Sequence, residues 1–411
     1  MPLTANHIDS TVPDLGNGPL STEPYISLDY FAAERENIFG KLWLNVGRLM
    51  EIPAPGSFVL KAVEIRNASV LVTHGKDGVI RAFHNVCSHR ASKVEWRTQG
   101  SSSAFTCPYH AWTFDLEGQL RSVPNEANFI GLNKKNCGLT PIACEVWKDL
   151  IFINLDPKPA QSLREYLGGL ATYGDDYPFD ELDACVSLVV PEVRCNWKIF
   201  MDAFQELYHI NVLHRQTLKT TYGGRDNPHG DPLYFRTFGP HRSLSFGFNV
   251  DHPVGPVEQM SQRFANDLTS SATAALNSSK ATAQQQRAGL NPSNAHNWAF
   301  DINTIFPNTL WLAGHGAFNI HRFWPITAHT TRYEATIYNP RPKRASERFA
   351  RELRFGLFRD TVVEDVLNTE LCQQALLSGA KQQVYLQTGE ISIRHHLHAV
   401  DRYVRGEAAH V

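Results

Sequence analysis

The chain has 411 residues, of which 42% are hydrophobic and 19% are charged, and its formal net charge is -2. This is an ordinary globular composition, and the length is sufficient for two domains. The charge balance and the lack of a long basic run argue against nucleic acid as a partner, and no apolar stretch of about 20 residues is available to span a membrane. The first residues have neither the basic nor the apolar segment of a secretory signal, so we expect a cytoplasmic protein.

The first part of the chain predicts a loose arm, a helix and then an all-β module. Residues 1–20 are rich in Pro, Gly and Asn, and Ser27–Phe39 carries apolar residues at near-helical spacing. From about residue 44, short β-rich runs alternate with turn residues, as in an antiparallel sheet. The module closes near Leu155, where Asp156–Pro159 breaks the pattern. We therefore predict an arm and helix at 1–43, a β-domain at 44–157 and a second domain at 158–411.

Two mixed Cys/His pairs lie inside this β-module. Cys87 and His89 form a Cys-x-His pair, and Cys107 and His110 form a Cys-x-x-His pair. Two thiolates for one iron and two imidazoles for the other are the ligands of a Rieske 2Fe-2S cluster. A structural zinc site accepts the same residue types, but its usual spacing groups paired Cys and paired His separately. The order of the ligands therefore favours the 2Fe-2S cluster.

The second domain is predicted to be α+β, with an antiparallel sheet and C-terminal helices. Ser162–Leu170 has a helical pattern, and residues from about Ser346 to Arg405 are mostly helical in pattern. The predicted strands are Cys185–Val193, Asn303–Leu312, Gly316–Trp324 and Arg332–Tyr338. The polar tract 253–299, with helical spots at Met260–Ala265 and Ala281–Arg287, predicts a lid or a partly disordered loop.

The segment Asn196–His214 gathers metal-binding side chains within this second domain. His209 and His214, joined by one carboxylate, would form the ligand set of a non-haem ferrous iron with positions open to dioxygen. Residues five apart are about 140° from each other on an α-helix, so a shared metal predicts a π-bulge or a break. Glu206 is placed to orient His209, and Asp202 is a second acidic candidate for a catalytic role. The segment leaves open which carboxylate is the third ligand, and a His pair on an ordinary surface helix remains an alternative.

Short motifs along nearly the whole chain form a recognisable combination. They are Glu34–Trp43, Pro53–Gly56, Asn85–Arg90, Cys107–Trp112, Asn196–Lys198, Glu206–His209, Ile305–Asn308 and Glu364–Asp365 with Glu370 and Gln373. With these motifs the chain resembles the α subunit of Rieske non-haem iron aromatic-ring-hydroxylating oxygenases. The resemblance implies an N-terminal Rieske domain followed by a helix-grip catalytic domain, whose antiparallel sheet curves about a long helix. Ala203 departs from the pattern, because many relatives have Asn there.

The resemblance also assigns metal ligands. It implies that Cys87 and Cys107 bind one iron of the cluster and that His89 and His110 bind the other. For the mononuclear iron it implies the ligands His209, His214 and Asp365. The residues by themselves left Asp202 and Glu364 as equal alternatives to Asp365.

The expected function is that of a terminal oxygenase in a multicomponent system. No Gly-x-Gly-x-x-Gly follows a strand, so electrons must come from a separate reductase, with or without a ferredoxin. Dioxygen is the co-substrate, and hydroxylation of an aromatic or hydrophobic small molecule is expected. N- or O-demethylation by a monooxygenase is the alternative, and a pure electron carrier and a zinc-stabilised binding protein are remoter ones.

The resemblance further implies a homotrimer, with or without a β subunit, in which electrons pass between subunits through His110, Glu206 and His209. Apolar candidates for the substrate pocket lie near the iron segment and in the later strands. They are Phe204, Leu213, Leu218, Tyr222, Phe306 and Leu310. Their character favours an aromatic or hydrophobic substrate.

Overall fold

The computed structural model describes residues 8–9, 12–175, 177, 179–218, 220–222, 224–266, 290–314 and 317–407. The chain forms two compact units: the first unit is Arg35–Tyr166, and the second unit is Met1–Glu34 with Leu167–Val411. The N-terminal arm belongs to the second unit, where β1 (Leu20–Ser21) pairs with β19 (Gln383–Val384). The domain boundaries 1–43, 44–157 and 158–411 stay a prediction.

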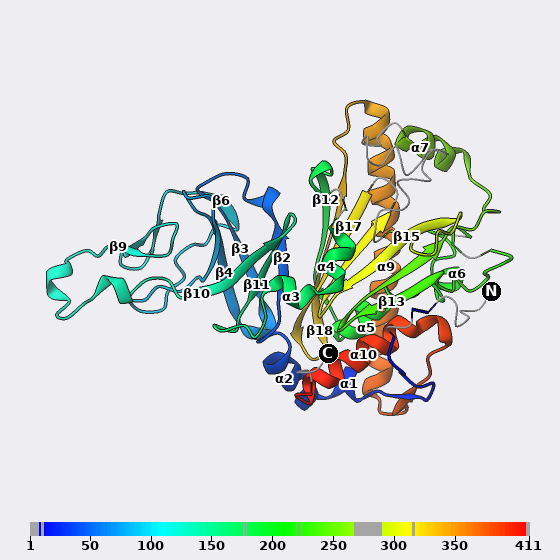
Figure 1. Ribbon diagram of the computed structural model, residues 1–411, viewed down its shortest axis with the longest axis horizontal. Coiled ribbons are helices and arrows are strands. Elements are labelled where there is room, and N and C mark those ends of the chain that lie inside the picture. The colour runs from blue at the N-terminus through cyan, green and yellow to red at the C-terminus, as the bar shows by residue number, and fades with distance from the viewer. Residues whose placement is uncertain are drawn as a thin grey trace. The chain divides into compact units, whose positions relative to one another are not determined.

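The first unit is all-β, as the sequence predicts. Its larger sheet has the antiparallel order β2-β11-β10-β5-β4-β3-β6, and its smaller sheet the order β7-β8-β9 (Figure 1). The strands are β2 (Leu44–Arg48), β3 (Ser57–Val63), β4 (Ala68–His74), β5 (Ile80–His84), β6 (Gln99–Ser101), β7 (Phe105–Thr106), β8 (Thr113–Phe114), β9 (Leu120–Ser122), β10 (Pro141–Trp147) and β11 (Leu150–Asn154). The predicted runs of apolar and β-branched residues therefore coincide with strands.

One apolar core joins the two sheets of the first unit. Phe58, Phe105, Trp112 and Phe114 are buried in it together with Cys87 and other apolar side chains. Burial of large aromatic side chains contributes about 2–3 kcal/mol each to the hydrophobic driving force. The loops that carry the Cys/His pairs are thus anchored on a packed core.

The second unit is built on one antiparallel sheet with the order β12-β18-β17-β16-β15-β14-β13. Its strands are β12 (Ala184–Val193), β13 (Tyr234–Phe238), β14 (His241–Gly247), β15 (Trp298–Ile305), β16 (Thr309–Gly314), β17 (Ala317–Thr327) and β18 (Thr330–Asn339). The helices are α1 (Glu23–Ile26), α2 (Leu28–Asn37), α3 (Leu163–Leu167), α4 (Gly169–Gly174), α5 (Trp197–Asp202), α6 (Ile210–Leu213), α7 (Pro256–Asn266), α9 (Ala345–Leu377) and α10 (Ile391–Val404), of which α2 and α3 cross the boundary between the units. The long helix α9 runs beside the sheet (Figure 1), and the α+β prediction is confirmed.

Two predicted elements are wrong in detail. The single strand expected over Asn303–Leu312 is two strands, β15 and β16, because the turn Phe306-Pro307-Asn308 separates them and proline has no N–H for the ladder. The helix expected over Ser162–Leu170 is split into α3 and α4 at Gly168, whose φ of 50° lies outside the helical region. In the tract 253–299, α7 covers the first helical spot, the second lies outside the described residues, and β15 begins at Trp298.

A buried ion pair ties the N-terminal arm to the second unit. Lys198 Nζ lies 2.5 Å from Glu34 Oε1, both side chains are fully buried, and Trp197 Nε1 donates to Glu34 Oε2 at 3.0 Å. Separating such a pair by removing one partner typically costs about 3–5 kcal/mol, because the other charge stays buried. The pair therefore fixes α2 against α5.

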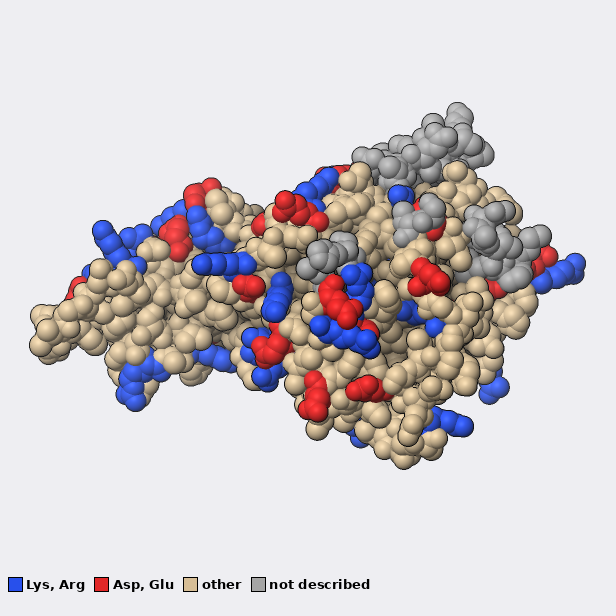
Figure 2. Space-filling model, turned by 60° about the horizontal axis from the view of Figure 1, so that its bottom comes forward, with Lys and Arg blue, Asp and Glu red and all other residues tan. Residues whose placement is uncertain are grey.

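Charged side chains of both signs are interspersed over the face shown in Figure 2. Such mixing accompanies a formal net charge of -2. Across the ranges that the structure describes, every helix is too short or too polar to cross a membrane.

Candidate metal centres

The segment Asn196–His214 is not one continuous helix. Helix α5 begins after Asn196, whose side chain accepts from Lys198 N, and it ends at Asp202. Helix α6 covers only Ile210–Leu213, with His209 and His214 flanking its two ends. The break that five-residue spacing predicts is therefore present, and it allows the two imidazoles to face each other.

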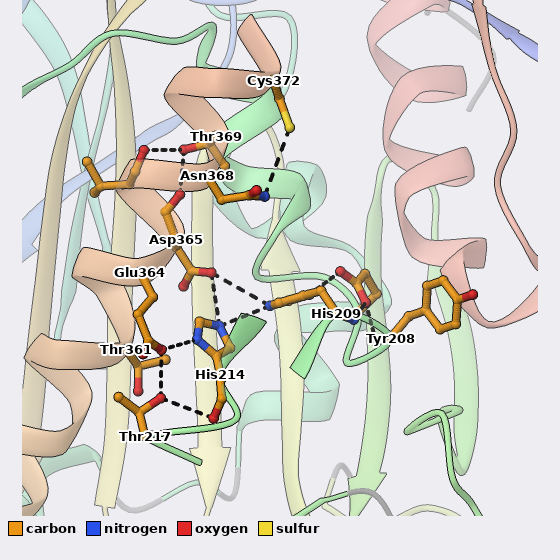
Figure 3. Close-up of polar contacts among 12 residues, drawn as sticks. Tyr208, His209, His214, Thr217, Thr361, Glu364, Asp365, Asn368, Thr369 and Cys372 are labelled. Carbon is orange, nitrogen blue, oxygen red and sulfur yellow. Dashed lines mark hydrogen bonds and ion pairs between the residues drawn. The ribbon is translucent and has the colours of Figure 1, made fainter. Parts of the chain in front are cut away.

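Three side chains converge at this break. His209 Nε2 lies 3.1 Å from His214 Nε2, and Asp365 Oδ1, from α9, lies 3.6 Å and 3.0 Å from these two atoms respectively (Figure 3). The potential ligand atoms of the three residues all lie within 4.8 Å of one another. Two imidazoles and one carboxylate meeting on one side match a non-haem iron(II) site.

The outer nitrogen of each imidazole is held by a glutamate. His209 Nδ1 is hydrogen-bonded to Glu206 Oε1, and His214 Nδ1 lies 2.6 Å from Glu364 Oε2. Glu364 Oε2 also accepts from Thr217 Oγ1 at 2.7 Å. If each Nδ1 donates to its glutamate, each neutral ring turns the lone pair of Nε2 toward the convergence point.

The electrostatics of the convergence point favour a bound cation. Asp365 is only 3% exposed, burial raises the pKa of its carboxyl group, and its Oδ1 lacks a well-directed hydrogen bond within the described structure. Burial alone would lower the pKa of His214, but its contacts with Asp365 and Glu364 produce a net rise. Three lone pairs brought this close repel one another unless a cation or a proton lies between them, so the residues fit a metal ion.

The two candidate catalytic acids occupy different environments. Glu206 is 8% exposed and contacts His209, as predicted. Asp202 instead accepts from Tyr25 Oη at 2.8 Å and from Gln205 Nε2 at 3.3 Å, and burial raises its pKa to about 7. Its catalytic role stays a prediction.

The six candidate pocket residues are not all placed alike. Phe204 packs edge-on against His321 and stacks on Tyr333, and Leu310 lies opposite His321 in the neighbouring strand. Tyr222 stacks on Phe248. Leu213, the last residue of α6, and Leu218, beyond it, are partly exposed. Phe306 is fully buried and stacks on Tyr403 of α10. A role in substrate binding stays a prediction for all six.

The two Cys/His loops of the first unit have matching backbones. Ala91 N donates to Cys87 O at 3.0 Å, and Ala111 N donates to Cys107 O at 2.9 Å. Both alanines are left-handed, with φ values of 58° and 57°. The backbone N–H of each cysteine also bonds to the residue that follows the alanine, Ser92 or Trp112. The two loops therefore present their Cys and His side chains on equivalent backbones.

The side chains at the tips of these loops fit an iron-sulfur cluster. His89 Nδ1 and His110 Nδ1 lie 3.1 Å apart, and the His89 ring stacks on Trp112. Cys87 and Cys107 are each 2% exposed and unpaired, and burial raises the pKa of the Cys87 thiol, which favours the neutral thiol in the absence of a metal. A bound metal reverses that preference by stabilising the thiolate.

Glu364 has a contact that the sequence did not reveal. Its adjacency to Asp365 made it a rival third ligand, yet it contacts the outer nitrogen of His214. Adjacent helix residues lie about 100° apart, so two neighbouring carboxylates cannot approach one metal from the same side. This difference in direction is the sequence feature that could have separated the roles of Glu364 and Asp365.

Residues 179–406 match the family described as ring hydroxylating alpha subunit (catalytic domain), and residues 42–142 match the Rieske [2Fe-2S] domain. The chain belongs to the ring-hydroxylating α-subunit family. Its cofactors are accordingly a Rieske 2Fe-2S cluster and a mononuclear non-haem iron, and the zinc alternative is not supported.

Relatives of this α-subunit chain include both monooxygenase and dioxygenase subunits. The glycine betaine monooxygenase oxygenase subunit of Pseudomonas aeruginosa is 34% identical over 196 residues, 48% of this chain and 44% of that protein. The biphenyl 2,3-dioxygenase subunit alpha of Rhodococcus jostii is 34% identical over 203 residues, 48% of this chain and 43% of that protein. The alignments therefore span less than half the length of these relatives.

Among solved structures, a quaternary ammonium Rieske monooxygenase shares the fold. It superposes with a TM-score of 0.73 at 23% identity, over 94% of this chain and 95% of that one. Agreement at this identity establishes the architecture of a Rieske domain joined to a catalytic domain.

Proposed function

We propose that this chain is the terminal oxygenase component of a multicomponent enzyme that hydroxylates an aromatic or hydrophobic small molecule. Dioxygen is the oxidant, and electrons come from a separate reductase, with or without a ferredoxin. The observation that supports the proposal most is the convergence of His209, His214 and Asp365 in a chain that also carries a Rieske domain. These three side chains would hold an iron(II), which would have positions left for dioxygen and would supply the electrons for its activation.

The protein's side chains hold and orient the groups that would bind the metal. Glu206 and Glu364 keep a proton on Nδ1 of the two imidazoles, so that Nε2 stays available to the metal. Phe204, Phe323 and Tyr333 pack against one another, and Tyr333 interacts electrostatically with Asp365 of this centre. Their rings exclude water from the space where an apolar substrate would meet the metal.

Monooxygenation that removes an N- or O-methyl group is the second candidate function. Similarity to a glycine betaine monooxygenase subunit favours this second function. Similarity to a biphenyl 2,3-dioxygenase subunit favours aromatic dihydroxylation instead. A panel of aromatic hydrocarbons and methylated amines, turned over with ¹⁸O-labelled dioxygen and a supplied reductase, separates the two. Two labelled oxygens in one ring product indicate dioxygenation, and one labelled oxygen with released formaldehyde indicates demethylation.

The ligand assignments are tested with two variants of the holoenzyme. Asp365→Ala is expected to lose the mononuclear iron and at least about 100-fold of the turnover while keeping the cluster absorbance, because it removes one of three ligands. Cys107→Ser is expected to lose the cluster chromophore and keep the mononuclear iron. Asp360→Ala, on the exposed side of α9, is the matched control. Iron retained by Asp365→Ala, or a cluster retained by Cys107→Ser, would overturn the corresponding assignment.

We further propose that the working form is a homotrimer in the cytoplasm, with or without a β subunit. Reduced cysteines are consistent with that compartment, since no disulfide joins any of the seven. In the ring, electrons would pass from the cluster of one chain to the iron of the next through His110, Glu206 and His209. Glu206 supports this route, because its carboxylate already holds His209 and has further acceptor positions.

A further inference from the structure

A cavity of about 190 Å³ lies between α9 and the strands β12, β17 and β18 of the second unit. One part of its wall is apolar and includes Ile337, Phe355 and Phe358. Another part is formed by side chains that carry N–H groups, among them Asn339, Arg351 and Arg354. The lining contains no aspartate or glutamate.

Along α9, this cavity lies on the face that carries the metal ligand. Arg354 precedes Asp365 by eleven residues. Around the axis of an α-helix, the two residues therefore differ in direction by only about 20°, and along the axis they are about 16 Å apart. Phe358 precedes Asp365 by seven residues and again differs by about 20°. One face of α9 therefore runs from the metal site to the cavity, where the Arg354 residue is exposed to solvent.

Paired residues of β17 and β18 also lead from the metal site to the cavity. Phe323 pairs with Tyr333, His321 with Ala335, and Asn319 with Ile337. The first pair packs around Phe204 near the metal site, and the last pair lines the cavity. Successive rows are two residues apart, so the cavity begins about 13 Å from the metal-site row. The His321 ring meets Phe358 edge-on between the two.

The polar end of the cavity offers donors without acceptors. Asn339 is only 4% exposed, yet its Nδ2 has no hydrogen-bond partner in the described structure. Arg354 forms no ion pair with a described carboxylate, whereas Arg351 is 2.6 Å from Glu352. Leaving a buried donor unpaired costs about 1–3 kcal/mol, so a group that accepts from Asn339 and neutralises Arg354 would bind favourably here.

Two further observations connect this end to its surroundings. Arg354 interacts electrostatically with Tyr222, which lies eight residues beyond His214 in the chain. Beyond Arg351, a second cavity is lined by further cations, including Lys343 and Arg348, at the start of α9. The arginines of this lining that are paired with carboxylates are Arg341, Arg344 and Arg351. The attraction of anions therefore rests on Lys343 and Arg348.

We infer that this cavity binds the carboxylate of an elongated apolar acid, with Arg354 and Asn339 as its partners, and that such acids are substrates. That these acids are substrates rests on the proposed oxygenase function. That the cavity binds a carboxylate rests on the cavity alone. The apolar part of the wall would hold the hydrocarbon portion, and its far end would reach toward His209, His214 and Asp365 when the His321 and Phe358 rings, which meet between the two sites, separate. The separation of about 13 Å requires a long molecule, which excludes benzoate-sized acids from using both ends at once.

Calorimetric titration of the holoenzyme with 8-phenyloctanoate, its methyl ester and 3-phenylpropanoate tests the inference. The long acid is expected to bind at least about 10-fold more tightly than its ester or the short acid. Arg354→Gln should weaken binding of the long acid by about 10- to 100-fold and leave the ester unchanged, because only the acid loses a charge-assisted hydrogen bond. Arg354→Lys should restore part of the loss, and Asn339→Leu should cause a smaller one of about 3- to 10-fold. Arg359→Gln, whose residue pairs with Asp360 at an exposed position of α9, is the matched control.

Equal binding of the acid and the ester, or an equal loss in Arg354→Gln and Arg359→Gln, would overturn the carboxylate site. Turnover assays with a supplied reductase keep the two proposals apart. Oxidation of neutral aromatics without Arg354-dependent acid binding would refute the site and leave the oxygenase function in place. Arg354-dependent binding of acids without oxidation of any panel compound would support the site and refute the oxygenase function. Thermal unfolding of each variant identifies a loss caused by misfolding, in which case Arg354→Lys carries the test.

Discussion

At the scale of single residues, the candidate iron site owes its geometry to carboxylates behind the imidazoles. Glu206 holds His209 and Glu364 holds His214, each at Nδ1, and Thr217 further fixes Glu364. Such outer contacts set the tautomer and the direction of a ligating nitrogen. The site is thus prepared by the protein before a metal enters.

Replacement of Glu364 by Gln is expected to weaken iron binding by about 10- to 100-fold, because the amide is a poorer acceptor for His214 Nδ1–H. Competition with a ferrous chelator measures this affinity, and the cluster absorbance should not change. Glu352→Gln, on the same helix and paired with Arg351, serves as the control. An unchanged iron affinity in Glu364→Gln would show that the glutamate does not orient the ligand.

Asp202 makes stability depend on pH. Burial dominates its environment and raises its pKa from 3.8 to about 7, although Tyr25 and nearby cations act in the opposite direction. Between these values the folded chain keeps a proton that the unfolded chain has lost, so the free energy of unfolding falls as pH rises from about 4 to 7 and then levels off.

Asp202→Asn has no such titration, so its free energy of unfolding relative to the wild type should rise over the same interval, by about 2–4 kcal/mol. Urea unfolding at several pH values measures this difference. Asp360→Asn, at an exposed position, should show no comparable trend. A difference between Asp202→Asn and the wild type that stays constant from about pH 4 to 7 would contradict the assignment.

At the scale of elements, tight turns position the cluster loops. Gly118 turns the chain between β8 and β9 with φ of 78°, and a Cβ added there would overlap the Phe83 ring. Phe83 is 4% exposed and belongs to the core beneath the cluster loops. The hairpin and the core therefore depend on the same glycine.

Gly118→Ala is expected to destabilise the first unit by about 2–4 kcal/mol, since backbone strain of about 1 kcal/mol adds to overpacking against Phe83. Gly78→Ala isolates the strain, because Gly78 has φ of 79° and open space around its Cβ position. Thermal unfolding followed by the cluster absorbance measures both variants. Equal losses of stability in the two variants would show that the Phe83 ring moves aside without destabilising the core.

At the scale of the whole molecule, the two candidate metal centres belong to separate units. Each unit has its own sheet, and the Cys/His loops lie in the first unit while the 2-His-1-carboxylate group lies in the second. In the proposed trimer, a cluster serves the iron of a neighbouring chain. Two chains with different defects should then complement each other.

Mixing Cys107→Ser chains with Asp365→Ala chains and reassembling them is expected to restore about one tenth or more of the wild-type activity per mixed ring, because some neighbours pair an intact cluster with an intact iron site. Native mass spectrometry confirms that mixed rings form, and wild-type chains taken through the same procedure give the reference. Inactive mixed rings beside recovered wild-type rings would refute the route between subunits.

Local sequence patterns alone predict the cluster chemistry, the all-β first unit and the α+β second unit. Cys87, His89, Cys107 and His110 lie so close in the chain that local loops bring them together, and alternating apolar runs determine strands locally. The five-residue spacing of His209 and His214 likewise predicts, for a shared metal, the helix break that the structure contains.

Tertiary structure alone decided which distant groups meet. Asp365 reaches His209 and His214 across more than a hundred residues, and only the packing of α9 gives Asp365 and Glu364 their different contacts with His214. The same packing brings Arg354 to a cavity wall with Asn339 of β18, a pairing without any trace in the local sequence. Spacing rules extend over a few helical turns, whereas contacts between distant segments depend on how a whole sheet and helix bury their apolar faces.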